Sequence, residues 1–128
     1  MLSKKGVDLQ TSVILKYENG AQAILNSTMI NTTPCRAVIS GENGMIEIDP
    51  IFYAPSSFQV SLNNGEIRDY PNKYLGHGLR EQAIEFVKCI NMKLEETPRM
   101  KHLESLSVME TMDKIRKELG LVFPNEIS

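Results

Sequence analysis

Residues 1–75 alternate between apolar and polar side chains with the period of two that is typical of β-strands. The clearest run extends from Val7 to Tyr17, where Leu9, Val13 and Leu15 are separated by polar residues in most of the intervening positions. Further strand-like runs lie at 21–30, 35–40, 45–49, 58–62 and 66–70. We therefore expect about six strands in this part of the chain.

The strand-like runs form three consecutive pairs, and an Asn-Gly dipeptide lies between the two runs of each pair. These dipeptides stand at Asn19-Gly20, Asn43-Gly44 and Asn64-Gly65. Asn-Gly is favoured in type I′ turns, because both central residues of that turn take positive φ. The spacing predicts three β-hairpins and an open, mostly antiparallel, meander-like sheet.

Residues 79–120 change to helical periodicity. A first helix is indicated by apolar residues at 3.6-residue spacing, with charged residues on the opposite side (apolar: Leu79, Ala83, Phe86, Val87, Ile90, Leu94). Thr97-Pro98 marks a break, and a second helix runs from about Lys101 to a left-handed C-cap at Gly120. Strands followed by helices predict one α+β domain over residues 1–128, with two C-terminal helices covering one face of the sheet.

The other face of this expected sheet carries apolar residues among polar ones. Strict alternation places Ile14, Ile24, Ile30 and Val38 there, together with Gln10, Gln22, Asn26, Thr28 and Arg36. Such a half-apolar face is compatible with docking of a partner, and equally with a solvated face that carries scattered apolar residues.

Charge and composition exclude several classes of protein. Fourteen basic residues against 16 acidic ones give a net charge of −2, without the basic excess expected of a nucleic-acid partner. No apolar run approaches the roughly 20 residues that span a bilayer. Two cysteines, Cys35 and Cys89, are too few for a disulfide scaffold, so we expect a cytoplasmic protein.

Candidate chemistry is sparse. The histidines, His77 and His102, have no neighbouring Cys or His at metal-ligand spacing, so no metal site is expected. The segment Gly41–Gly44 precedes a strand and is interpreted as a hairpin, not a phosphate loop. Gly76–Gly78 opens a helix and could meet an anionic or hydroxylated ligand. No P-loop, nucleophile elbow or dinucleotide fingerprint occurs.

Four segments in this order and spacing resemble one family: Val7–Ser27, Ala37–Ile48, Gly76–Ile90 and Glu96–Pro124. The pattern is similar to the C-terminal domain of the glucose-fructose oxidoreductase/inositol dehydrogenase (Gfo/Idh/MocA) family, in its dihydrodiol dehydrogenase-like branch. The most specific part is the ending, in which two helices flank Thr97-Pro98 and are followed by Gly120-Leu121 and Phe123-Pro124.

This resemblance implies an NAD(P)-dependent oxidoreductase that acts on CH–OH groups of sugars, cyclitols or dihydrodiols. In the family, NAD or NADP and the catalytic Lys belong to an N-terminal Rossmann domain, whose motifs are missing here. We therefore expect a fragment that serves as substrate-binding and oligomerisation domain, without catalytic or cofactor-binding residues and inactive alone. The alternative is a non-catalytic binding or dimerisation module.

The resemblance also implies a set of substrate-binding residues. Asn31 and Thr33 enter the third strand, where relatives often carry aromatic residues, and an ordinary turn is the competing interpretation. Lys73, Tyr74 and His77 lie on the loop before the first helix. A small polyhydroxylated substrate would bind there, and a homodimer or higher oligomer would form through Gln22–Thr28 on the open sheet face.

Overall fold

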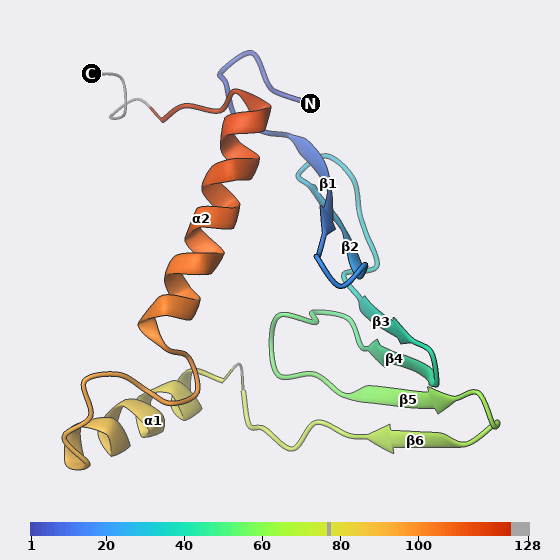
Figure 1. The fold of residues 1–128 in the computed structure, drawn as a ribbon, viewed down its shortest axis with the longest axis vertical. Coiled ribbons are helices and arrows are strands. Elements are labelled where there is room, and N and C mark those ends of the chain that lie inside the picture. The colour runs from blue at the N-terminus through green and yellow to red at the C-terminus, as the bar shows by residue number, and fades with distance from the viewer. Residues whose placement is uncertain (77, 124–128) are drawn as a thin grey trace. The chain divides into compact units, whose positions relative to one another are not determined.

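A computed structural model describes residues 1–76 and 78–123 of the chain (Figure 1). It confirms an α+β fold with six antiparallel strands followed by two helices. The elements are β1 (Gln10–Lys16), β2 (Gln22–Thr28), β3 (Ala37–Gly41), β4 (Gly44–Ile48), β5 (Phe58–Leu62), β6 (Ile67–Tyr70), α1 (Leu79–Asn91) and α2 (His102–Leu119).

The strands form two sheets, which corrects the expectation of a single one. β1 pairs with β2 alone, and the second sheet has the order β3-β4-β5-β6. The break falls at residues 29–36, where Pro34 lacks an N–H and Cys35 adopts a left-handed φ of 51°. The carbonyl of Cys35 accepts hydrogen bonds from the N–H groups of Ile51 and Phe52, 3.0 and 3.3 Å away.

The hairpins are present, but the expected type I′ turns are wrong. None of the three turn asparagines has a positive φ, whereas Gly20 and Gly65 have φ of 86° and 88°. The Gly20 N–H donates to the carbonyl of Tyr17 and the Gly65 N–H to that of Leu62. Both loops therefore have three residues, with glycine alone in the left-handed position. Asn side chains support this form, since the Oδ1 of Asn64 accepts the Glu66 N–H at 3.0 Å.

The chain divides into two compact units, of which the first contains β1, β2 and α2. The register of the hairpin places Ile14 opposite Ile24, and these side chains are 62% and 78% exposed. Ser12 and Asn26 share that face, joined by a 3.0 Å bond from the Asn26 amide to the Ser12 hydroxyl. The predicted composition of the open face is therefore confirmed for this hairpin. The left-handed C-cap at Gly120 of α2 is confirmed as well.

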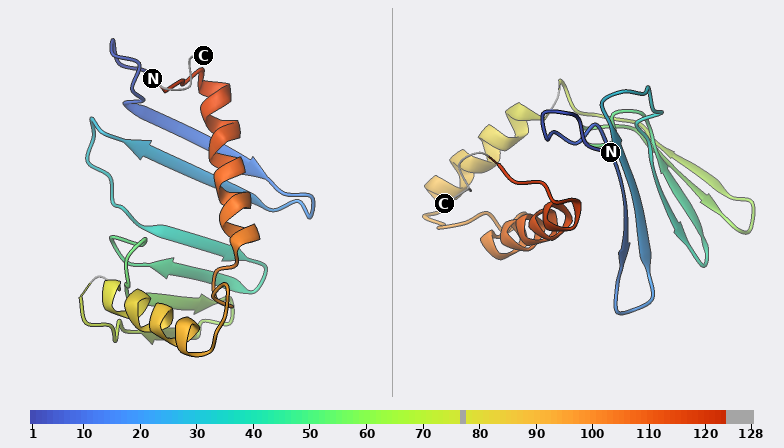
Figure 2. Two further views of the ribbon diagram at one scale, coloured as in Figure 1. Left: turned by 90° about the vertical axis from the view of Figure 1, so that its left-hand side faces the viewer. Right: turned by 90° about the horizontal axis from the view of Figure 1, so that it is seen from above.

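The second unit, residues 34–97, contains β3 to β6 side by side and α1 (Figure 2). Its strand register separates the side chains into two unlike faces. One face is mainly apolar and includes Ile39, Ile46, Ile48, Val60 and the stacked rings of Phe58 and Tyr70. The other face is mainly polar and includes Val38, Ser40, Met45, Glu47, Gln59, Ser61, Ile67 and Asp69.

Within the second unit, helix α1 is covered mainly on its charged side. Its most covered residues are Glu81, Glu85 and Cys89, whereas Phe86 and Ile90 are 68% and 58% exposed. The Thr97 hydroxyl donates to the Glu85 carboxylate at 2.9 Å, which places the segment after the helix beside that side. Since α1 and α2 belong to different units, the covering of one sheet face by both helices stays a prediction.

Candidate functional site

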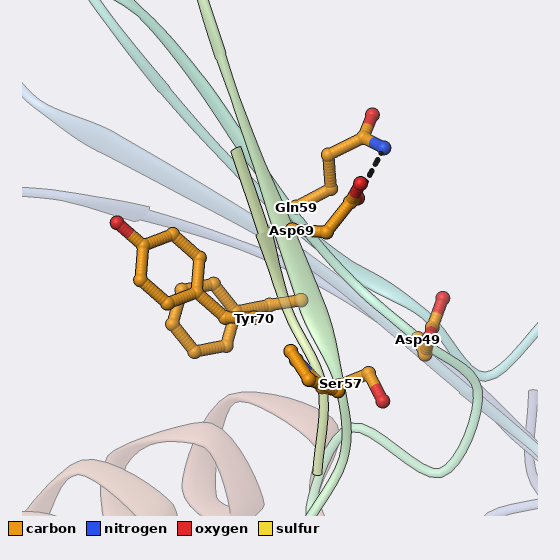
Figure 3. A pocket seen from close by; sticks show the side chains of 7 residues that line it. Asp49, Ser57, Gln59, Asp69 and Tyr70 are labelled. Atoms are coloured by element: carbon orange, nitrogen blue, oxygen red, sulfur yellow. Dashed lines mark hydrogen bonds between the residues drawn. The ribbon is translucent and has the colours of Figure 1, made fainter. Parts of the chain in front are cut away.

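A shallow pocket of about 340 Å³ lies on the polar side of the second sheet, near the ends of β4, β5 and β6. Its polar lining consists of Asp49, Ser57, Gln59 and Asp69, and Phe58, Tyr70 and Pro71 complete it. Figure 3 shows the side chains of Gln59 and Asp69 on one side of the strands and the Tyr70 ring on the other. Strand pairing explains this arrangement, because Gln59 stands directly opposite Asp69 and successive side chains alternate between faces.

Hydrogen bonds orient two of the lining groups. The Gln59 amide donates to Asp69 Oδ1 at 2.8 Å, so its own carbonyl oxygen is left as an acceptor (Figure 3). The Ser57 hydroxyl oxygen accepts the Asn72 N–H at 3.0 Å, which leaves the hydroxyl proton for another acceptor. With the carboxylates of Asp49 and Asp69, the pocket is rich in acceptors. Hydroxyl groups of a polyol are donors that suit such a lining.

The segment after β6 adjoins this pocket and contains two of the predicted site residues, Lys73 and Tyr74. Both are exposed, and the Tyr74 side chain retains 55% of its accessible surface. The Tyr74 N–H donates to Asn72 Oδ1 at 2.8 Å, and the Asn72 N–H reaches the pocket residue Ser57. Asn72 therefore links the segment of Lys73 and Tyr74 to the pocket residue Ser57, although neither of these two side chains is among the pocket's lining residues. His77, predicted for the same loop, lies outside the described residues.

Asn31 and Thr33, the other predicted substrate residues, lie in the irregular segment after β2. Both are exposed, and they belong to the first unit, whereas Lys73 and Tyr74 belong to the second. The N–H of the preceding Ile30 donates to the Thr28 hydroxyl at 3.2 Å, so a local turn starts this segment. Their role in substrate binding stays a prediction.

The sequence analysis did not single out the residues that line the pocket. The polar ones among them are ordinary residues in or next to strands, and only strand pairing brings them together. The hairpin turns carried a usable signal, because pairing β5 with β6 across Asn64-Gly65 places Gln59 opposite Asp69. Asn72 follows Pro71, a pair of residues that is common in turns, but nothing in the sequence reveals its contacts with residues 55 and 57.

Two carboxyl groups that lie outside the pocket, those of Glu66 and Glu81, have their pKa lowered by ion pairs. A hydrogen bond from Arg68 at 2.7 Å, aided by its charge, lowers the pKa of Glu66 below its ordinary value. A hydrogen bond from Arg80 at 2.8 Å likewise lowers the pKa of Glu81 in the first turn of α1. Both pairs favour the anionic form of the carboxylate, and neither includes a residue that lines the pocket.

The described residues do not fit a dinucleotide. Such a site needs a parallel strand–turn–helix unit whose glycine-rich turn meets the pyrophosphate. All strand pairs in residues 1–76 and 78–123 are antiparallel. The glycine-flanked Gly41–Gly44 segment is a hairpin turn. The same residues contain no group of three or more His, Cys, Asp or Glu side chains that could hold a metal ion.

Comparison with known proteins shows similarity to dehydrogenases over almost the whole chain. It is 34% identical to trans-1,2-dihydrobenzene-1,2-diol dehydrogenase of Xenopus tropicalis, an alignment that covers 96% of this chain and 39% of the relative. It is 31% identical to scyllo-inositol 2-dehydrogenase (NADP(+)) IolU of Bacillus subtilis, with 93% of this chain and 36% of the relative covered. D-xylose 1-dehydrogenase (NADP(+)) of Hypocrea jecorina is 27% identical, with 96% and 35% covered.

The chain thus spans less than two-fifths of the length of these relatives. No family model and no solved structure matches it. Among the described residues, no helix is long and apolar enough to cross a membrane.

Proposed function

Because the chain belongs to the Gfo/Idh/MocA family of oxidoreductases, we propose that it forms the substrate-binding and oligomerisation part of an NAD(P)-dependent dehydrogenase. The enzyme would act on CH–OH groups of sugars, cyclitols or dihydrodiols. One observation carries this proposal: similarity to dehydrogenases of a dihydrodiol, an inositol and a sugar extends over at least 93% of the chain.

The pocket supports the proposed class of substrate. Polyols present several hydroxyl donors close together, and Asp49, Gln59 and Asp69 in the lining offer oxygen atoms that accept hydrogen bonds. Lys73 and Tyr74 follow the pocket residue Pro71 in the chain and would add donors of their own. The family resemblance also implies Asn31 and Thr33, which belong to the first unit, and His77 as substrate-binding residues.

The cofactor would be held elsewhere. The described residues contain no Rossmann-type parallel strand–turn–helix unit, so we assign NAD or NADP to a nucleotide-binding part of the same enzyme. In this proposal the chain alone binds no nicotinamide cofactor and turns over no substrate. Cys35 and Cys89 are unpaired thiols, which supports a reducing, cytoplasmic location.

A second candidate function is association without catalysis. The directly opposed, exposed Ile14 and Ile24 favour it, because an apolar centre within polar neighbours is typical of protein interfaces. This surface fits a homodimer or higher oligomer in either case. Catalysis by the full-length protein decides between a dehydrogenase and a non-catalytic module.

The decisive experiment compares this chain with the full-length protein encoded by the same gene. Purified samples are assayed for NADP⁺ and NAD⁺ reduction with scyllo-inositol, D-xylose and trans-1,2-dihydrobenzene-1,2-diol. We expect activity with at least one probe for the full-length protein and none for the chain alone. Hydride transfer by the chain alone, or a full-length protein inert toward all three probes, contradicts the proposal.

A matched pair of variants tests the site itself. Tyr74→Phe in the full-length enzyme should raise the KM for the polyol several-fold and leave the KM for the cofactor unchanged. Tyr53→Phe removes the same hydroxyl from another exposed tyrosine of the second unit and should change neither constant. Equal effects of the two substitutions would argue against a substrate-facing Tyr74.

A further inference from the structure

Asn72 uses its backbone N–H and both ends of its side-chain amide in hydrogen bonds, and these bonds connect two separate segments of the second unit. Its Nδ2 donates to the carbonyl of Pro55 at 2.8 Å, and its N–H donates to the hydroxyl oxygen of Ser57 at 3.0 Å. Its Oδ1 accepts the Tyr74 N–H at 2.8 Å. We propose that Asn72 is a positioning residue of the substrate site, which holds Lys73 and Tyr74 in place against residues 55–57. This inference rests on the proposed function.

The segment that receives Asn72 is itself well fixed. The Ser56 hydroxyl bonds to the carbonyls of Ile51 and Ala54, at 3.0 and 3.1 Å. The carbonyl of Ser57 accepts the Asp49 N–H at 3.0 Å, which extends the pairing of β4 with β5. Pro55 has a locked φ and no N–H to satisfy. Asn72 is thus bonded to a segment that is held in place by its own hydrogen bonds.

The far end of the loop approaches the same proline. Gly78 precedes α1 with a φ of 85°, and a Cβ added there would lie 3.1 Å from the Cγ of Pro55. A side chain at this position would therefore need both a strained backbone and movement of Pro55. Asn72 thus bonds to the Pro55 carbonyl at one end of the loop, and Gly78 leaves no room for a side chain beside the Pro55 ring at the other.

The attachment of this loop affects substrate binding, because a residue on a mobile backbone must be ordered before it can bind a ligand, and this ordering weakens the affinity. Lys73 and Tyr74 are exposed and have long side chains, so a mobile backbone beneath them would add an entropic cost to substrate binding. Asn72 fixes that backbone before the substrate arrives. Its loss should therefore weaken substrate binding without removing any group that touches the substrate.

Two substitutions separate the bonds of Asn72. Asn72→Ala removes both side-chain bonds. Asn72→Asp keeps an oxygen for the Tyr74 N–H but loses the donor to the Pro55 carbonyl. Asn63→Ala is a matched control, because the Asn63 amide also bonds to a distant backbone carbonyl of the same unit, that of Glu42 at 2.7 Å.

The first readout is amide hydrogen exchange in the chain itself, followed by NMR. Asn72→Ala should speed exchange of the Tyr74 N–H about tenfold or more, while Asn72→Asp and Asn63→Ala leave it within about threefold of the unaltered protein. Unchanged Tyr74 exchange in Asn72→Ala would overturn the positioning role.

The second readout is steady-state kinetics of the full-length protein with scyllo-inositol, D-xylose and the dihydrodiol. Asn72→Ala should raise the KM for the accepted polyol about tenfold, with the KM for the cofactor and kcat little changed, and Asn63→Ala should alter none of them. If Tyr74→Phe raises that KM but Asn72→Ala does not, the inference fails and the proposed function stands. If neither changes it, the inference fails and Tyr74 is not a substrate-binding residue, while turnover of the polyol by the full-length protein still supports the proposed function.

Discussion

The ring of Phe58 on β5 lies flat against the ring of Tyr70 on β6, with centroids 4.5 Å apart and an interplanar angle of 8°. The two residues are directly paired across the strands, at the end of the sheet that carries the pocket. We expect Phe58→Ala to lower the free energy of unfolding by about 1–2 kcal/mol, because a cross-strand aromatic pair is lost from a partly exposed site. Urea denaturation followed by circular dichroism measures the loss.

Phe52→Ala is the control for this substitution. Phe52 makes only a 5.7 Å edge contact with its chain neighbour Tyr53 and belongs to no strand. Its removal should cost clearly less than that of Phe58. Equal costs would show that the Phe58–Tyr70 stack adds nothing beyond the burial of one ring.

The ion pair between Glu66 and Arg68 predicts a pH dependence of known sign. Arg68 lowers the pKa of Glu66 from its ordinary value of 4.5, so the pair stabilises the fold above that pH. Its contribution is lost as the pH falls below 4.5 and through the lowered pKa of the folded state. The group is exposed, so the effect is small and decreases with salt.

NMR titration of the Glu66 side chain measures this shift directly. Arg68→Ala should raise the pKa of Glu66 toward 4.5. Arg36→Ala, which removes another exposed arginine of the same unit, should leave it unchanged. A Glu66 pKa that is indifferent to Arg68 would contradict the ion pair.

Ile24 lies at the centre of the proposed association surface, opposite Ile14. The unaltered chain should form dimers at high micromolar concentration, and Ile24→Glu should convert them to monomers, because a carboxylate would be buried against an apolar partner. Ile90→Glu places the same charge at an exposed isoleucine of α1, outside the sheet face, and should leave the dimer intact. Sedimentation equilibrium distinguishes the dimer from the monomer. A monomeric unaltered chain at that concentration would contradict the proposed homodimer.

Asn31 and Thr33 allow the substrate-binding interpretation to be tested against an ordinary turn. If they contact substrate, Thr33→Val in the full-length enzyme should raise the KM for the polyol about tenfold, because the hydroxyl partner is lost while the shape is kept. If they form only a turn, the KM stays constant. Thr32→Val, at the neighbouring exposed position, is the control.

Periodicity and turn residues were sufficient to predict the elements. The alternation from Val7 to Tyr17 and the three Asn-Gly pairs predicted the hairpins, and the Thr97-Pro98 break and Gly120 delimited α2 closely. The type I′ turns were a wrong inference, because the Oδ1 atoms of Asn19 and Asn64 accept the N–H groups of Ala21 and Glu66, and positive φ is left to glycine alone. An Asn-Gly pair in the sequence does not reveal which of the two forms, a type I′ turn or a three-residue loop supported by the Asn side chain, the hairpin will adopt.

The site was harder to foresee. The family resemblance drew attention to Lys73 and Tyr74, but Asp49, Ser57 and Gln59 are unremarkable in sequence and lie together only through strand register. The α1 helix illustrates the same difficulty. Its apolar stripe predicted an inner face, but nothing in the sequence reveals the bond from Thr97 to Glu85 that places the following segment beside the charged side.

The sequence by itself determined the α+β class, the six strands and two helices, and the membership of an oxidoreductase family. These properties follow from local periodicity and from similarity along the chain. Tertiary structure alone decided that the strands form two sheets, that a polar pocket gathers at β4–β6, and that Asn72 holds the neighbouring loop to Pro55. Such features depend on hydrogen bonds between residues far apart in sequence, and local patterns do not encode those partners.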